Sequence, residues 1–193
     1  MRKPREAPES DKNRHGLLWK NYAESLRVVF GEVDSGEVMA VRQELLALSS
    51  REGTVFCAGN GGSAANSSHF VTDLGKGVSM SEGPHRFRAI CLADNIPTMT
   101  AYGNDVAFSD IFSRPLSNLA VKSDLVIAFS VSGDSDNIVG LLKTAQSLGL
   151  RTAAFLGNGG GSAVQYSDVA VVVGSSHPGL VEDLHSSLAH YLA

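Results

Sequence analysis

The chain has 193 residues, which is enough for one sizeable α/β domain with a hydrophobic core but short for two. Its hydrophobic fraction of 43% and charged fraction of 19% are those of an ordinary globular protein, and its formal net charge is −4. This balance gives no basic surface for nucleic acid or for an anionic membrane, so neither is expected as a partner. Any phosphate that binds must therefore be held locally, by loops.

The N-terminus and the cysteines indicate where in the cell the protein is expected. Residues 1–14 are mostly charged and contain two prolines, so we predict a disordered tail there and one domain over residues 15–193. The tail lacks the apolar segment of a secretory signal, and no later run reaches the ~20 apolar residues of a membrane span. Cys57 and Cys91 lie in apolar runs, as buried reduced thiols do. A cytoplasmic protein is expected.

Two helices are expected before the core. Apolar residues recur at three- and four-residue steps over residues 16–30, which indicates an amphipathic helix. A second helix should begin at Asp34 or Ser35 and end before Gly53. Such helices serve association or cover a sheet face, and the sequence favours neither.

Strands and helices then alternate along the chain. Short apolar runs predict five strands, at residues 54–58, 87–92, 125–129, 152–156 and 169–173. Helices are expected after Pro97, ending at 103–105, and over 110–119, 136–148 and 179–192, with glycine-containing connections at 75–84 and 157–162. This pattern predicts the α/β class, with a doubly wound, mostly parallel five-stranded sheet behind the two N-terminal helices.

A glycine-rich turn follows the first predicted strand. Gly59, Gly61 and Gly62 have no Cβ atom to keep a ligand from the backbone, so their N–H groups can bind an anion where the next helix begins. Ser63 adds a hydroxyl. Many such turns are only tight connections, so this signal is weak by itself.

Other polar groups lie where they could join this turn. His69 and Asp73 are four residues apart and share a helix face, although such pairs are commonly just solvated. Residues 130–135 form a hydroxyl-rich loop after the third strand, where serine could also act only as a helix cap. The carboxyl ends of parallel strands crowd together, which favours one shared site. The last helix carries further titratable groups: Glu182, Asp183, His185 and His190.

These residues together resemble the sugar isomerase (SIS) domain family, and within it the phosphoheptose isomerases, from about Leu17 to the C-terminus. The resemblance is carried by Gly-Asn-Gly-Gly-Ser-Ala at 59–64, His-Phe at 69–70, Gly-Asn-Asp at 103–105, Asp-Ile-Phe-Ser-Arg at 110–114, Ser-Val-Ser-Gly-Asp-Ser at 130–135, and Glu-Asp-Leu-His at 182–185 with His190. It implies a ketose–aldose isomerase that interconverts sedoheptulose 7-phosphate and D-glycero-D-manno-heptose 7-phosphate through an enediolate.

The resemblance also implies the roles of individual residues. It implies phosphosugar contacts from Asn60, Gly61, Gly62, Ser63, His69, Asp73, Asn104, Asp105, Ser130, Val131 through its backbone, Ser132, Ser135 and Glu182. It implies one Zn²⁺ ion at His69, Asp73, Glu182 and His190, with Asp73 and His190 as the acid/base pair. The best-known members have Glu at the position of Asp73 and Gln at the position of Glu182.

These two departures and the helix geometry leave alternatives open. Asp is one methylene shorter than Glu, which would set the carboxylate about 1.5 Å back, and Glu182 could compensate. Glu182 and His190 are eight residues apart, about 12 Å along a helix, so one chain cannot easily bring both to one ion. Either His185 replaces one ligand or a neighbouring subunit supplies it, as the family's interfacial sites and homotetramers imply. A non-catalytic SIS module that binds a phosphosugar or a protein, or an isomerase of another phosphosugar, stays possible.

Overall fold

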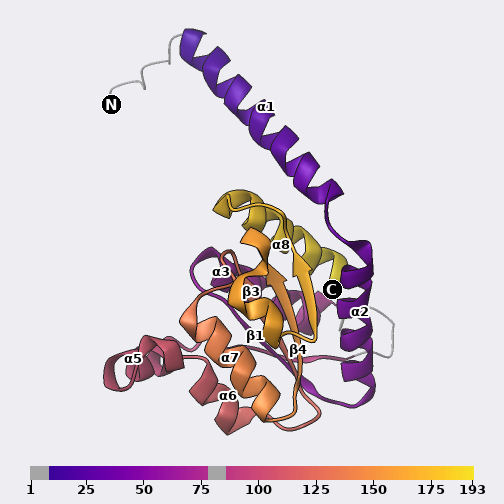
Figure 1. The fold of residues 1–193 in the computed structure, drawn as a ribbon, viewed down its shortest axis with the longest axis vertical. Coiled ribbons are helices and arrows are strands. Elements are labelled where there is room, and N and C mark those ends of the chain that lie inside the picture. Colours follow the sequence, from indigo (N-terminus) through magenta and orange to yellow (C-terminus); the bar gives the residue numbers. More distant parts are fainter. Residues whose placement is uncertain (1–8, 78–85) are drawn as a thin grey trace.

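The computed structural model describes residues 9–77 and 86–193, with side chains from residue 18 onward. A five-stranded sheet with the strand order β2-β1-β3-β4-β5 forms its centre (Figure 1). The strands are β1 (Thr54–Ala58), β2 (Arg88–Cys91), β3 (Leu125–Ser130), β4 (Arg151–Leu156) and β5 (Val169–Val172). Every neighbouring pair is parallel, which confirms the predicted doubly wound sheet.

Strand β3 is the centre of the sheet, because it pairs with β1 on one side and β4 on the other. All of its residues are buried, as its continuously apolar sequence predicts for a strand covered on both faces. The buried carboxylate of Asp124, which directly precedes β3, accepts hydrogen bonds of 2.7 Å from the N–H groups of Thr54 and Val121. This carboxylate therefore aligns the starts of β1 and β3.

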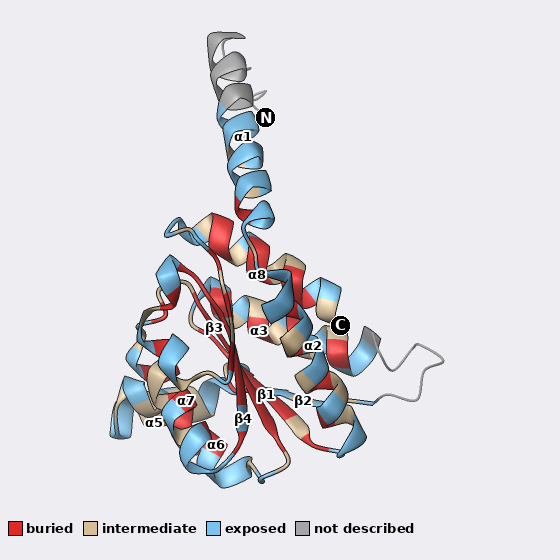
Figure 2. Cartoon of the chain, turned by 45° about the vertical axis from the view of Figure 1, so that its right-hand side comes forward, coloured by how far each residue is buried: buried red, intermediate tan, exposed pale blue. Residues whose placement is uncertain are grey.

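Helices cover both faces of the sheet (Figure 2). One face is covered by α2 (Ser35–Ser50), α3 (Gly62–Thr72) and α8 (Pro178–Leu192), whose apolar side chains share one hydrophobic cluster with the sheet. The other face is covered by α5 (Ile96–Asp105), α6 (Ser113–Leu119) and α7 (Asp136–Ser147), which form a second cluster. The strand order reverses between β1 and β3, which is where ligands bind in sheets of this kind.

The short elements differ in detail from the expectation. The single helix expected over residues 110–119 is divided into a 3₁₀ turn, η2 (Phe108–Asp110), and α6. Helix α5 ends at Asp105, within the expected range 103–105. The turn expected at 157–162 is the start of a 3₁₀ segment, η3 (Asn158–Tyr166). Of the connection expected at 75–84, residues 75–77 belong to a π-helical turn, η1 (Asp73–Gly77), and the remainder lies outside the described residues.

Helix α1 (Glu9–Gly31) begins earlier than expected and projects away from the body of the protein (Figure 1). Of the predicted disordered tail, residues 1–8 lie outside the described residues, and residues 9–14 lie in α1. Between Pro8 and Gly16 the sequence contains neither proline nor glycine, so no residue there disfavours a helix. The single domain over residues 15–193 stays a prediction.

The attachment of α1 to the body is local. The Tyr22 hydroxyl donates a 2.7 Å hydrogen bond to Asp183 Oδ2 in α8, and this bond to a carboxylate raises the pKa of Tyr22 to about 12. Val29 is buried, but several large apolar side chains of α1 are exposed: Leu18, Trp19, Val28 and Phe30. The helix therefore presents an apolar surface that the described part of the chain does not cover.

The two cysteines lie side by side on neighbouring strands. Cys57 in β1 and Cys91 in β2 are register partners, and both are free and buried, as the sequence indicated. Burial raises the pKa of the Cys91 thiol to about 12 and that of the Cys57 thiol well above its usual value. Both are therefore neutral thiols.

In the described part of the chain, no helix combines the length and apolarity of a membrane span.

One histidine lies in the hydrophobic core. His185 is fully buried in α8, with its ring about equally far from those of Phe129 (6.0 Å) and Phe155 (6.1 Å). Neither of its ring nitrogens has a hydrogen-bond partner among the described residues. Burial lowers the pKa of His185 to about 4, with a weak opposing effect from the Leu156 backbone. It is therefore a neutral core side chain at neutral pH.

This burial predicts an acid-sensitive fold. In the unfolded chain His185 binds a proton below about pH 6.5, whereas in the folded protein it does so only near pH 4, so stability should be lost as the pH falls through this interval. The loss should be on the order of 3 kcal/mol. Urea unfolding at pH 7 and pH 4.5 should show a smaller drop for His185→Leu than for the wild type, while Leu184→Met, a buried control, should keep the wild-type drop. Equal drops for wild type and His185→Leu would contradict this assignment.

Candidate active site

A pocket of about 170 Å³ lies at the carboxyl ends of β1 and β3. Its walls come from the turn at 59–63, from the end of β3 with the loop at 130–135, and from α8, and they are formed by Asn60, Ser63, Phe129, Ser130, Val131, Ser132, Ser135 and Glu182. This is the place where the strand order reverses, so the two predicted loops meet there as expected. A larger hollow of about 440 Å³ between β2, α5 and α6 contains none of the predicted site residues.

The glycine turn has backbone positions that disfavour a side chain. Gly61 has φ 55° and ψ −121°, a conformation that side chains disfavour. A Cβ atom on Gly59 would collide with the Ser63 backbone, and one on Gly62 would collide with the Glu182 carboxylate. Helix α3 then begins at Gly62 without a side-chain cap, so its first N–H groups are available to an anion.

The serine loop uses some of its hydroxyls to hold its own shape. Ser130 Oγ is buried and accepts a 3.0 Å hydrogen bond from the Gly133 N–H, and Ser132 Oγ accepts one of 3.1 Å from the Asp134 N–H. Each hydroxyl keeps its own O–H to donate to a ligand. Ser135 precedes α7 but makes no capping hydrogen bond with its side chain, so its hydroxyl is free to face the pocket.

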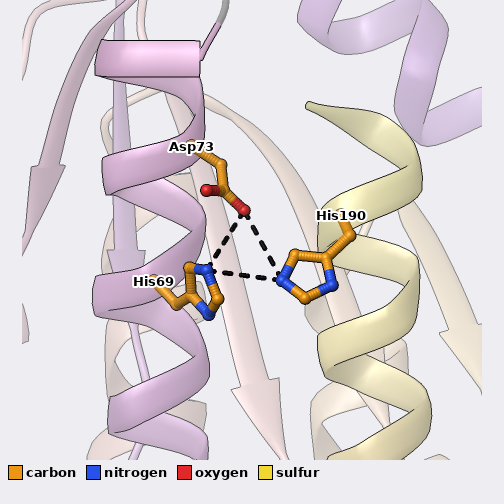
Figure 3. Close-up of side chains that lie close together, drawn as sticks. All are labelled: His69, Asp73 and His190. Atoms are coloured by element: carbon orange, nitrogen blue, oxygen red, sulfur yellow. Dashed lines mark hydrogen bonds and ion pairs between the residues drawn. The ribbon is translucent and has the colours of Figure 1, made fainter.

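A second group of polar side chains lies in the groove between α3 and α8 (Figure 3). His69 Nε2 lies 3.5 Å from Asp73 Oδ2 and 3.3 Å from His190 Nε2, and His190 Nε2 lies 3.8 Å from Asp73 Oδ2. Both imidazoles are about half exposed, and the carboxylate is more deeply placed. The three ligand atoms converge on one point, so the shorter side chain of Asp73 does not keep its carboxylate from this group.

The donor set suits a metal ion. Two imidazole nitrogens and one carboxylate oxygen lie within 4.8 Å of one another. Zn²⁺ binds nitrogen and oxygen at about 2.0–2.1 Å, which in a tetrahedral site separates neighbouring ligands by about 3.3 Å. The separations of 3.3 to 3.8 Å between these atoms are close to that value. His69, Asp73 and His190 could therefore hold a metal ion within one chain, without a ligand from a second subunit.

The other predicted metal ligands lie elsewhere. The Glu182 side chain lines the pocket and does not belong to the group of three, as its distance from His190 along α8 suggested. His185, the local alternative, is enclosed in the core. Both residues are thus separated from the imidazole and carboxylate group, which needs neither of them to reach three ligands.

Two predicted substrate residues do not reach the pocket of their own chain. Asn104 and Asp105 lie at the end of α5, are exposed, and pair with each other through a 2.6 Å hydrogen bond from Asn104 Nδ2 to Asp105 Oδ1. Neither residue lines the pocket. Of the remaining predicted contacts, His69 and Asp73 lie with His190 between α3 and α8, and the others are in the pocket wall or in the turn beside it.

Two residues of the site were not predicted. Phe129 forms part of the pocket wall although it lies at the buried end of β3, where its sequence indicates only core packing. Asn137 in α7 is 2% exposed and exchanges hydrogen bonds with Asn60. An uncharged polar residue one turn beyond a hydroxyl-rich loop is the only signal that could have marked it.

The chain is similar in sequence to known proteins. The family profile described as the SIS domain matches residues 20–157. The chain is 32% identical over 174 residues to the phosphoheptose isomerase of Chlorobaculum parvum, covering 89% of this chain and 82% of the relative. It is 33% identical over 174 residues to that of Syntrophotalea carbinolica, covering 89% and 88%.

Solved structures agree on the fold. The phosphoheptose isomerase GmhA from Neisseria gonorrhoeae matches with a TM-score of 0.84 at 23% identity, covering 94% of this chain and 95% of that one. A phosphoheptose isomerase from Francisella tularensis matches with a TM-score of 0.82 at 23% identity, covering 96% of each chain. With the sequence matches above, these findings establish that the chain belongs to the SIS domain family and, within it, to the phosphoheptose isomerases.

Proposed function

We propose that the protein interconverts sedoheptulose 7-phosphate and D-glycero-D-manno-heptose 7-phosphate. Its curated relatives are named phosphoheptose isomerases, and its two polar centres suit the two ends of such a substrate. The pocket of backbone N–H groups and hydroxyls suits a phosphate. The group of His69, Asp73 and His190 suits proton transfer at a carbonyl end.

The distance between these two centres is the observation that carries the proposal. Glu182 in the pocket wall and His190 in the group of three are both on α8, about 12 Å apart along the helix. A substrate with its phosphate in the pocket must extend over two helical turns to present its carbonyl carbon to the group. A long open-chain sugar, phosphorylated at the end opposite the carbonyl, has this form, whereas a short phosphosugar would not reach.

In the proposed mechanism, the start of α3 and the serine hydroxyls hold the phosphate and so orient the sugar. Asp73 removes the proton from C1 of the ketose and returns it to C2, through a carboxylate oxygen that is not bound to a metal. His190 Nε2 moves the second proton between the oxygens on these two carbons while no metal is bound to this nitrogen; an ion bound there would instead stabilise charge on these oxygens. Glu182 lies in the pocket wall, where its carboxylate can accept hydrogen bonds from sugar hydroxyls.

We propose Zn²⁺ as the metal, held by His69, Asp73 and His190. Three protein ligands with an open position are typical of catalytic zinc. When bound, the ion would supply positive charge that stabilises negative charge on the substrate oxygens. The orientation of both imidazoles toward one point supports this assignment.

We also propose a homo-oligomer, most simply a tetramer, in the cytoplasm. The exposed apolar side chains of α1 support association, because an isolated soluble chain rarely leaves such residues uncovered on one helix. Asn104 and Asp105, which lie outside the pocket of their own chain, are then candidates to contact substrate in a neighbouring one. The two free, buried cysteines support a reducing compartment.

The phosphate pocket predicts an effect on substrate affinity. Ser132→Ala with Ser135→Ala should raise KM for sedoheptulose 7-phosphate at least about tenfold, because hydrogen bonds to a charged group contribute roughly 1.5–3 kcal/mol each. Ser130 is a poorer probe because it is buried; Ser132 is less buried, although its hydroxyl also accepts a hydrogen bond within the loop, and Ser135 has no capping bond. Steady-state kinetics provide the measurement. Ser147→Ala, at the far end of α7, should leave KM unchanged. If the double variant also kept the wild-type KM, this pocket would not be the phosphate site.

The group of three predicts linked losses of metal and turnover. His69→Ala should lose both, measured by elemental analysis and by NMR of proton exchange at C1. Asp73→Asn keeps the size of the side chain but cannot accept the proton, so turnover should fall by ~10²–10⁴ while the phosphosugar still binds. Asp73→Glu should stay active.

The matched control for these variants is His177→Asn, which changes an exposed histidine but keeps a side chain that can cap α8. It should retain metal and turnover. If Asp73→Asn is as fast as the wild type, the base is another residue, with Glu182 the next to test. A wild type that binds the phosphosugar without proton exchange would instead establish a non-catalytic SIS module.

The apolar surface of α1 leads to a prediction about the oligomeric state. Leu18→Glu with Trp19→Glu should shift the mass measured by light scattering toward the monomer, because charge would be placed in the proposed interface. Asn21→Glu adds a negative charge at another exposed position of the same helix and should be milder. A fully active wild-type monomer would refute the proposed assembly.

A further inference from the structure

Two asparagine side chains join the loops that form the pocket. Asn60 Nδ2 donates to Asn137 Oδ1, and Asn137 Nδ2 donates to Asn60 Oδ1, both at 2.8 Å. Asn60 lies in the turn after β1, and Asn137 lies in the first turn of α7, after the serine loop. In the described ranges 9–77 and 86–193, no other side-chain hydrogen bond joins the segment at 59–63 to the segment at 130–137.

The two partners differ in their surroundings. Asn60 is half-buried and lines the pocket, whereas Asn137 is 2% exposed and does not line it. A buried amide needs partners for its N–H and C=O groups, and Asn60 provides one of each. Asn137 therefore faces Asn60 and has no place in direct contact with a ligand in the pocket.

The reciprocal pairing couples the orientation of the Asn60 amide to that of Asn137. If one amide alone rotated by half a turn, its NH₂ group would oppose the other NH₂ group and its oxygen the other oxygen, and both hydrogen bonds would be lost. In the observed orientation, Asn60 still has one N–H and one oxygen lone pair unused by the pair. Asn60 can offer these groups to a bound molecule in the plane that the pair holds.

We propose that Asn137 is a positioning residue, which holds the Asn60 amide in its ligand-binding orientation and locks the two pocket loops together. This inference rests on the proposed function of the pocket as a phosphosugar site. Its effect falls on substrate affinity, because the pair lies at the pocket, whereas the proton-transfer group of His69, Asp73 and His190 lies in the groove toward the other end of α8.

The first test changes one functional group of Asn137 and keeps the size of the side chain. Asn137→Asp replaces the NH₂ group by an oxygen, so at pH 8 the Asn60 oxygen loses its donor and faces another acceptor. KM for sedoheptulose 7-phosphate, and Kd measured by calorimetry, should both rise about tenfold, with kcat within about threefold of the wild type. Asn118→Asp makes the same chemical change on α6, outside the pocket, and should alter none of these constants.

The second test asks whether Asn137 acts through Asn60. Asn60→Ala should raise Kd by a similar factor, and Asn137→Ala should add no further increase in the Asn60→Ala background, because the residue that it positions is already gone. Urea unfolding of each variant separates this coupling from loss of stability. Independent, multiplying increases in Kd would overturn the proposal, as would an unchanged Kd for folded Asn137→Asp or a loss confined to kcat.

The outcomes also separate this inference from the proposed function. A wild type that binds the phosphosugar without turnover would overturn the isomerase proposal, and the Kd measurements would still decide the role of Asn137. A wild type that binds no phosphosugar at all would overturn both.

Discussion

The packing of α3 beside α8 is the contact on which the whole site depends. The two helices run side by side, so that their first turns form one wall of the pocket and their last turns carry the imidazoles. Gly62 leaves room for the Glu182 side chain, and Asn66 Nδ2 donates a 2.9 Å hydrogen bond to the Glu182 backbone oxygen. Further along, His69 meets His190. A shift of one helix against the other would therefore disturb phosphate binding and proton transfer together.

The site divides its tasks between backbone and side chains. In the proposed function, N–H groups and small hydroxyls serve the phosphate end, and they need an accurate loop conformation more than a particular acid or base. The proposed proton transfer depends on three titratable side chains between α3 and α8. Asp can stand at position 73 because its carboxylate lies 3.5 and 3.8 Å from the Nε2 atoms of the two imidazoles.

The sequence predicted the sheet because each strand is a short apolar run and each connecting helix has clear punctuation. Local patterns also located the loops at 59–63 and 130–135, since glycine and serine act there through the backbone. What failed depended on distant partners. No pattern shows that Glu182 turns toward Gly62 rather than toward His190, that His185 packs against Phe129 and Phe155, or that Asn137 pairs with Asn60. These placements are decided by tertiary packing, which joins residues far apart in the chain.

The neighbouring thiols of Cys57 and Cys91 can report whether the protein opens locally or unfolds as a whole. Each is a neutral, buried thiol, and only a thiolate attacks an alkylating reagent, so neither should be labelled in the closed fold. Cys91 lies in the edge strand β2, whereas Cys57 lies one strand further in, in β1. Edge fraying would expose the first alone, and loss of the central sheet would expose both. The ratio of their labelling rates would thus distinguish local breathing from global unfolding.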